Sequence, residues 1–179
     1  TKDGTVVEKQ YYALDIGLVK SIFMMEGDEI SSSLKELITG AGYEFAVRSF
    51  NFNVTDTDIE STFEDKTVTL KTGEGIKDFM TAEFLGGGLM SENTVINEMW
   101  IEPGSDVANV DFSKEFVTEM NAGTTKESGV LMSVANTIGY YHQVQKVIIT
   151  LDGEPYSSGH ILMKEGEAFD TTYQDDMED

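Results

Sequence analysis

The sequence predicts an α+β protein in which helices pack on an antiparallel or mixed β-sheet. Short runs rich in β-branched and aromatic residues alternate with segments whose apolar residues recur at helical spacing. Glycine and Asx turn signals separate these segments. The chain has 179 residues, enough for a sizeable core, because a chain of about 150 residues hides roughly two thirds of its unfolded surface.

The first forty residues predict two strands followed by a helix. The strands cover 6–15 and 18–26, which have a high apolar and aromatic content and are divided by a glycine turn. Three serines at 31–33, followed by Glu36, have the pattern of a helix start, in which a serine caps a first turn that contains an acid. We expect this helix to end at Gly40.

The next segment predicts a hairpin and a second helix. Alternating side chains indicate a strand at 43–54, which is expected to pair with a second run of β-forming residues at 67–72. Apolar residues at helical spacing predict a helix over 76–85, which ends at three consecutive glycines. This segment therefore supplies one hairpin and one helix to the predicted fold.

The second half of the chain carries the clearest alternation of strands and helices. Its predicted elements are strands at 95–101, 107–112 and 144–151, a short helix at 114–121 and a long helix at 124–140. The long helix is the best defined, because Val130, Val134 and Ile138 lie in one apolar stripe. The turn dipeptide Asp152-Gly153 ends the last strand.

The charge of the chain limits its partners. Asp and Glu number 33 and Lys and Arg only 12, which gives a formal net charge of −21. This balance excludes nucleic acid as a partner, because phosphate binding needs a basic surface, and it disfavours anionic membrane surfaces. Seven acids and no base follow Lys164, so residues 164–179 are predicted to form a flexible acidic tail.

Common catalytic and cofactor motifs do not occur in the sequence. There is no cysteine, and the only two imidazoles belong to His142 and His160. A P-loop, a nucleophile elbow and paired metal-binding histidines are all missing. We therefore predict no catalytic residue, no cofactor and no enzymatic activity. The many acids leave a carboxylate-dependent hydrolase as an alternative, which would need two carboxylates facing each other across a cleft.

One acidic turn is a candidate calcium site. Asp56, Asp58 and Glu60, preceded by Asn53, place oxygen ligands at close spacing. The run lacks the central glycine and the distal glutamate of an EF-hand loop, and Asx-rich turns are commonly exposed without a metal. We predict an ordinary exposed turn, with calcium binding as the alternative.

Three aromatic residues are candidates for binding a glycan. Trp100 lies in a predicted strand, and Tyr140 and Tyr141 lie at the end of the long helix. Core packing is the first expectation for such rings. Stacking on sugar rings is the alternative, and it requires that the aromatic side chains are exposed in a groove.

Several phrases of the sequence together resemble the GerM-type sporulation and spore-germination domain. They are a strand end at Val110 to Phe116 (VDFSKEF), an NTI phrase in the long helix and DGEP at 152–155. YYALD, LVKSI and SSLKELITG near the start also fit this family. The resemblance implies one compact α+β domain over 1–163, in which 43–75 is an insertion without a clear counterpart.

The resemblance also implies where such a domain works. It predicts a non-enzymatic, extracytoplasmic protein, secreted or lipid-anchored, that acts through protein–protein contact or self-assembly in the cell envelope. The matched positions are expected to determine the fold rather than to catalyse a reaction. Contact with a membrane is expected only through an anchor preceding Thr1, and a module that binds cell-wall glycan is the alternative.

Overall fold

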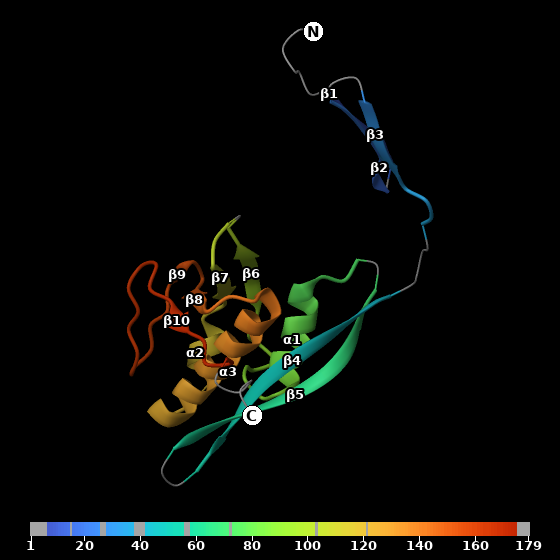
Figure 1. Cartoon of the computed structure of the whole chain (residues 1–179). Coiled ribbons are helices and arrows are strands. Elements are labelled where there is room, and N and C mark those ends of the chain that lie inside the picture. Colours follow the sequence, from blue (N-terminus) through green and yellow to red (C-terminus); the bar gives the residue numbers. More distant parts are fainter. Residues whose placement is uncertain are drawn as a thin grey trace. The chain divides into compact units, whose positions relative to one another are not determined.

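The computed structural model describes residues 7–14, 16–25, 28–37, 42–55, 58–71, 73–102, 104–120 and 122–174 (Figure 1). It divides the chain into two units, the first ending at Ala41 and the second beginning at Gly42. The predicted α+β class is confirmed, with several sheets and three helices among the described residues. The boundaries of the predicted domain, insertion and tail stay a prediction.

The first unit contains a three-stranded antiparallel sheet. Its strands are β1 (Val7–Ala13), β2 (Gly17–Met25) and β3 (Asp28–Ser33), with β2 in the centre. The prediction of a helix starting at the serines was wrong for the described part of that segment. Ser31 to Ser33 pair with β2, and this ladder satisfies the same backbone groups that a helix would have used.

The second unit contains a mixed sheet whose strands lie in the order β10-β8-β7-β6, with β9 paired to β8. The strands are β6 (Ile96–Ile101), β7 (Val107–Phe112), β8 (Lys146–Leu151), β9 (Glu154–Pro155) and β10 (Phe169–Asp170). β7 and β8 run parallel, and the other neighbours are antiparallel. The predicted tail region thus contributes β10, and Tyr173 beyond it is buried.

Three helices pack around this sheet. They are α1 (Ile76–Gly86), α2 (Glu115–Thr118) and α3 (Thr124–His142). The predicted apolar stripe of α3 is buried, as are Phe84 of α1 and Phe116 of α2. Phe116 stacks on Phe112 of β7 with ring centroids 4.2 Å apart, which joins α2 to the sheet.

A long hairpin completes the second unit. β4 (Tyr43–Val54) and β5 (Ile59–Leu70) pair along twelve residues each without a shift in register. α3 lies between this hairpin and the mixed sheet (Figure 1). The backbone N–H of Phe50 donates to Thr137 Oγ1 of α3 at 2.9 Å, so the edge of β4 is covered by the helix. The predicted hairpin is therefore present, with a second strand longer than predicted.

Candidate functional site

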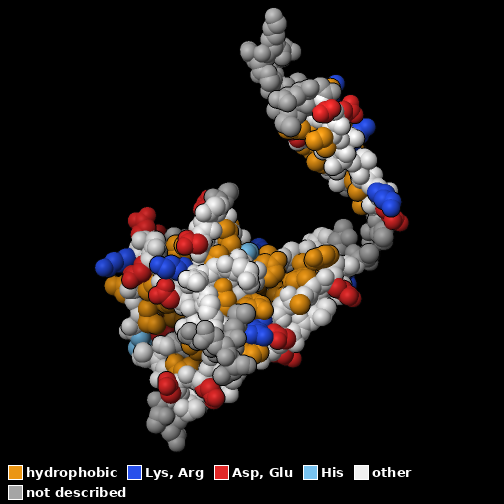
Figure 2. All heavy atoms as spheres, viewed as in Figure 1, with side chains coloured by type: hydrophobic (Ala, Val, Ile, Leu, Met, Phe, Trp, Pro, Cys, Tyr) orange, Lys and Arg blue, Asp and Glu red, His pale blue; other side chains and the backbone are white. Residues whose placement is uncertain are grey.

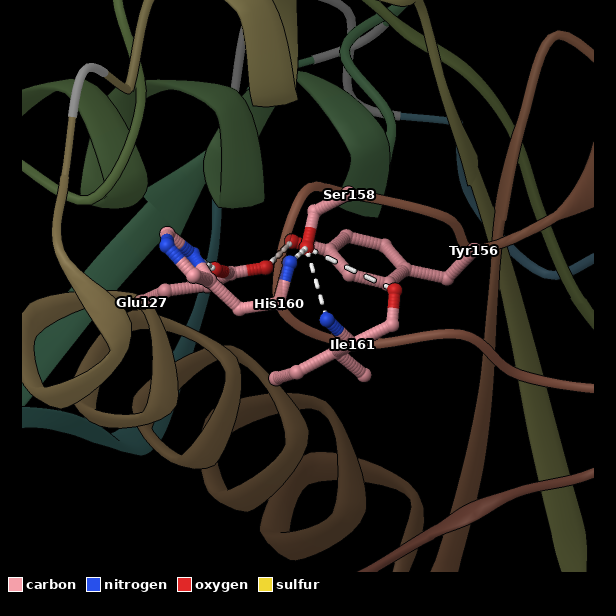
Figure 3. A network of polar contacts seen from close by, with 5 residues as sticks. All are labelled: Glu127, Tyr156, Ser158, His160 and Ile161. Atoms are coloured by element: carbon pink, nitrogen blue, oxygen red, sulfur yellow. Dashed lines mark hydrogen bonds and ion pairs between the residues drawn. The ribbon is translucent and has the colours of Figure 1, made fainter.

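A buried carboxylate at the start of α3 organises a network of polar side chains (Figure 3). Glu127 is only 3 % exposed. Its Oε1 accepts a hydrogen bond from the hydroxyl of Tyr156 at 2.7 Å, and its Oε2 lies 2.8 Å from Nδ1 of His160. Ser158 Oγ accepts the backbone N–H groups of His160 and Ile161, each at 3.0 Å. The network therefore ties the segment after β9 to the first turn of α3.

The electrostatics of this network favour one protonation state. Burial raises the pKa of Glu127, but hydrogen bonds from Ser158, Tyr156 and His160 outweigh burial and hold the pKa below its usual value. Burial, and next the Glu127 carboxylate, raise the pKa of the Tyr156 hydroxyl far above its usual value. A charged Glu127 beside a neutral Tyr156 is therefore the stable pair in the folded protein.

The Glu127 network has the geometry of a carboxylate that orients a histidine. Such a pair can assist catalysis when a nucleophile or metal lies at the other ring nitrogen. The hydrogen bonds of the Ser158 hydroxyl go to the Glu127 carboxylate and to backbone groups of its own loop. Within the described residues, no group of three or more His, Asp or Glu side chains could hold a metal ion. These contacts therefore indicate that the network anchors the segment after β9 to the start of α3.

This network predicts a stability window in pH. The folded pKa of Glu127 is lowered, so its contribution is present above pH 4.5 and is lost as the pH falls through the folded value. The folded pKa of Tyr156 is raised, so its contribution is complete below pH 10.0 and declines above it, by about 1.4 kcal/mol per pH unit. Urea unfolding across pH should show both limbs. Tyr156→Phe should lower the slope of the alkaline limb, and it should also shrink the acid limb because it removes one of the hydrogen bonds that lower the pKa of Glu127. An unchanged alkaline slope would contradict the assignment.

A second buried carboxylate joins the two most specific phrases of the sequence. Asp111 of β7 accepts hydrogen bonds from the backbone N–H of Gly153 at 2.8 Å and from Thr150 Oγ1 at 2.6 Å. Its other oxygen accepts from Asn97 Nδ2 of β6 at 2.8 Å. The VDFS and DG phrases thus meet at one point, where a carboxylate links three strand ends. This geometry explains both phrases as determinants of the fold.

The structure describes only part of the predicted calcium site. Asp56 lies outside the described residues. Asp58 closes the hairpin turn, since its Oδ1 accepts the N–H of Ile59 and its backbone oxygen accepts the N–H of Thr55. Glu60 lies exposed on β5. Calcium binding here stays a prediction.

The three aromatic candidates are not brought into one cluster by the contacts of the described residues. Trp100 lies on β6, where its Nε1 donates to Glu102. Tyr140 packs edge-on against Phe50 and Tyr173, and Tyr141 packs edge-on against Phe45. These contacts use the tyrosine rings in packing, and stacking on a glycan stays a prediction.

The first unit exposes many large apolar side chains. Phe23 of β2 and Ile30 of β3 are cross-strand partners, and they are 36 % and 60 % exposed. Figure 2 shows apolar side chains along this sheet. The other large apolar residues exposed in this unit are Tyr11, Tyr12, Leu14, Ile16, Leu18, Met24, Leu34 and Leu37. Such a concentration is typical of a surface that binds another protein.

Sequence reasoning missed the Glu127 network and the exposed sheet. Glu127 occupies the first turn of a helix, where acids are common, so nothing in the neighbouring sequence indicates that its side chain is buried. Its partners lie about thirty residues later in the chain. The apolar content of β1 and β2 predicted strands but not that the described residues of the unit would leave both faces of their sheet exposed.

The comparison with protein families assigns the chain to a class of sporulation domains. The family model Germane, described as sporulation and spore germination, matches residues 18–157. The chain therefore belongs to the Germane family, and the predicted GerM-type resemblance is confirmed. No curated protein matches the chain.

Two solved structures are similar at low sequence identity. A putative lipoprotein from Clostridium perfringens is 16% identical, with a TM-score of 0.44 over 75% of this chain and 93% of that chain. The tandem GerMN domains of the sporulation protein GerM from Bacillus subtilis are 18% identical, with a TM-score of 0.45 over 74% of this chain. The match covers 45% of the tandem-domain chain. Among the described residues, no helix has the length and apolar character needed to cross a bilayer.

Proposed function

We propose that this chain is a non-enzymatic, extracytoplasmic domain that binds other proteins of the cell envelope during sporulation or germination. Membership of the Germane family supports the link to sporulation. The exposed sheet of the first unit is the observation that carries the proposal of protein binding.

The sheet needs a covering layer that the described residues of its own unit do not supply. A sheet of three strands becomes stable when an apolar face packs on a helix or on a second sheet. The described residues of the first unit form strands and short connections only, and no helix. The apolar pair Phe23 and Ile30 therefore lies open to a partner.

The buried polar groups of the second unit support a role without catalysis. Asp111 and Glu127 are the acids buried among the described residues of this unit, and each is held by hydrogen bonds that join separate elements. Their partners are the Gly153 amide, the side chains of Asn97 and Thr150, the Tyr156 hydroxyl and the His160 ring, and each of these bonds joins two separate segments of the fold. Through these bonds both carboxylates stabilise the fold of the second unit.

The double variant Phe23→Ser/Ile30→Ser tests the proposed surface. Removing two exposed apolar side chains should weaken partner binding about a hundredfold while leaving the fold intact. The measurement is complementation of a strain that lacks the gene, scored by heat-resistant spores and germination, with crosslinking of the variant to envelope proteins. Leu162→Ser, at an exposed apolar position of the second unit, is the matched control. Full complementation by the double variant would refute the proposal.

A further inference from the structure

The hydrogen bonds of the hairpin reveal which backbone groups of β5 point outward. The N–H of Phe50 is directed to Thr137 of α3 and not to β5. In an antiparallel ladder this makes Phe50 and its partner Phe63 a pair that exchanges no hydrogen bonds. Because the pattern repeats every second residue, the N–H and C=O groups of Phe63, Asp65 and Thr67 all point away from β4.

These outward groups form a free strand edge. Within the part of the chain that the structure describes, the backbone groups of Phe63, Asp65 and Thr67 have no hydrogen-bond partner. β4 has its own outer edge covered by α3, whereas β5 forms the outer rim of the hairpin in Figure 1. The edge of β5 is therefore available for pairing with another strand.

Two of the features that normally protect a strand edge are missing from β5. Natural edges carry a proline, a bulge or charged side chains, above all lysine. β5 contains no proline, and its register with β4 is unbroken. Its single lysine, Lys66, reaches Glu83 of α1 at 2.6 Å, so the ammonium group is held toward the helix. The middle of β5 is thus an accessible edge without a proline or a bulge.

We propose that the outer edge of β5 receives an extended, basic segment of a partner protein as an added strand. The proposal rests on the proposed function, because it adds a second surface for envelope proteins and states the chemistry of the partner. Strand addition takes its affinity from main-chain hydrogen bonds and its specificity from alternate side chains.

The charges of this chain determine which kind of partner segment can pair with β5. Glu64 is 76 % exposed beside the edge, and Glu60 is exposed further along β5. The net charge of −21 attracts a basic partner and repels a second copy of the same chain. On the opposite face Phe63 is 45 % exposed, which suits an apolar residue next to it in the added strand.

A hollow beside the edge can hold a side chain of the added strand. Its volume is about 390 Å³, and it lies between the hairpin and the end of α1. Two acids, Glu64 and Glu83, and one base, Lys66, line it, and Gly86 and Gly87 leave it open because they have no side chains. Lys66 contacts both carboxylates, so the three groups together leave one negative charge for a basic side chain that enters this hollow.

The test uses the full chain and a short synthetic peptide of alternating valine and lysine. Binding is measured by fluorescence anisotropy at low and high salt, and by hydrogen exchange of individual backbone amides. We expect the amides of Phe63, Asp65 and Thr67 to become protected and the affinity to fall with salt. A peptide with glutamate in place of lysine should not bind. Peptide binding without protection of these three amides, or no binding at all, would overturn the proposal.

Thr67→Pro gives a variant that removes the edge and keeps the hairpin. The N–H of Thr67 takes no part in the ladder with β4, so proline there blocks only an incoming strand. It should weaken peptide binding about tenfold or more, and Thr67→Ala should not. Light scattering of the chain alone identifies the rival occupant, since dimers that Thr67→Pro disrupts would show that a second copy binds instead. The Phe23→Ser/Ile30→Ser variant should still bind the peptide, which separates failure here from failure of the proposed function.

Discussion

Replacing Asp111 with alanine is expected to lower the free energy of unfolding by about 3–5 kcal/mol. The substitution removes the acceptor for three donors, on Asn97, Thr150 and Gly153, at a position where the Asp111 side chain is buried. Hydrogen bonds to a charged group are worth roughly 1.5–3 kcal/mol each, and unpaired buried donors add a cost of their own. Urea unfolding of the purified chain measures the loss.

Asp152→Asn is the matched control for this experiment. Asp152 neighbours the same network, but its carboxylate is partly exposed and makes longer contacts, 3.2 Å to Asn97 and 3.7 Å to Lys114. Asparagine tolerates the left-handed backbone that this residue adopts, at a φ of 50°. The control should cost less than about 1 kcal/mol. Equal losses for both variants would show that Asp111 is not the central acceptor.

Gly139→Ala is expected to destabilise the second unit by about 2–3 kcal/mol, although alanine favours helices. A Cβ at this position of α3 would lie 2.5 Å from Thr171 Cγ2 and 2.9 Å from the backbone oxygen of Val144. The oxygen belongs to the main chain just before β8, so it cannot rotate away as a side chain would. Overpacking therefore exceeds the gain of about 1 kcal/mol in helix propensity.

Gly86→Ala is expected to change the stability of the same protein in the opposite direction. Gly86 ends α1, and a Cβ there would meet nothing within 4 Å. The substitution should leave stability unchanged or raise it by up to about 1 kcal/mol. Thermal unfolding of both variants, compared with the unmodified chain, decides the matter. A stabilising Gly139→Ala would mean that the C-terminal segment does not pack on α3 as described.

Local patterns predicted most elements, because their signals lie within one element. The helix at α3 and the strand at β7 needed only the spacing of their apolar residues. The serine cap pattern at residues 31–33 predicted a helix that does not form, because pairing with β2 satisfies the same backbone groups. A local cap pattern carries no information about a strand partner elsewhere in the chain.

The candidate site could be predicted only where the family resemblance linked residues that lie far apart in the chain. The VDFS and DG phrases were expected to determine the fold, but their meeting through Asp111 depends on the parallel pairing of β7 with β8. Nothing near Glu127 in the sequence indicates that Tyr156 and His160 bind it. Contacts between residues far apart in the chain are set by packing, which local periodicity does not encode.

The exposed apolar sheet of the first unit and the free edge of β5 have a consequence for how the protein avoids aggregation. Exposed apolar strands and bare edges are the features from which aggregates grow. A net charge of −21 on every copy makes each collision between copies repulsive, so the same acids that exclude many partners also prevent self-aggregation. Conditions that neutralise the acids, such as low pH or high divalent salt, remove this electrostatic repulsion, while the exposed apolar sheet and the free edge of β5 remain.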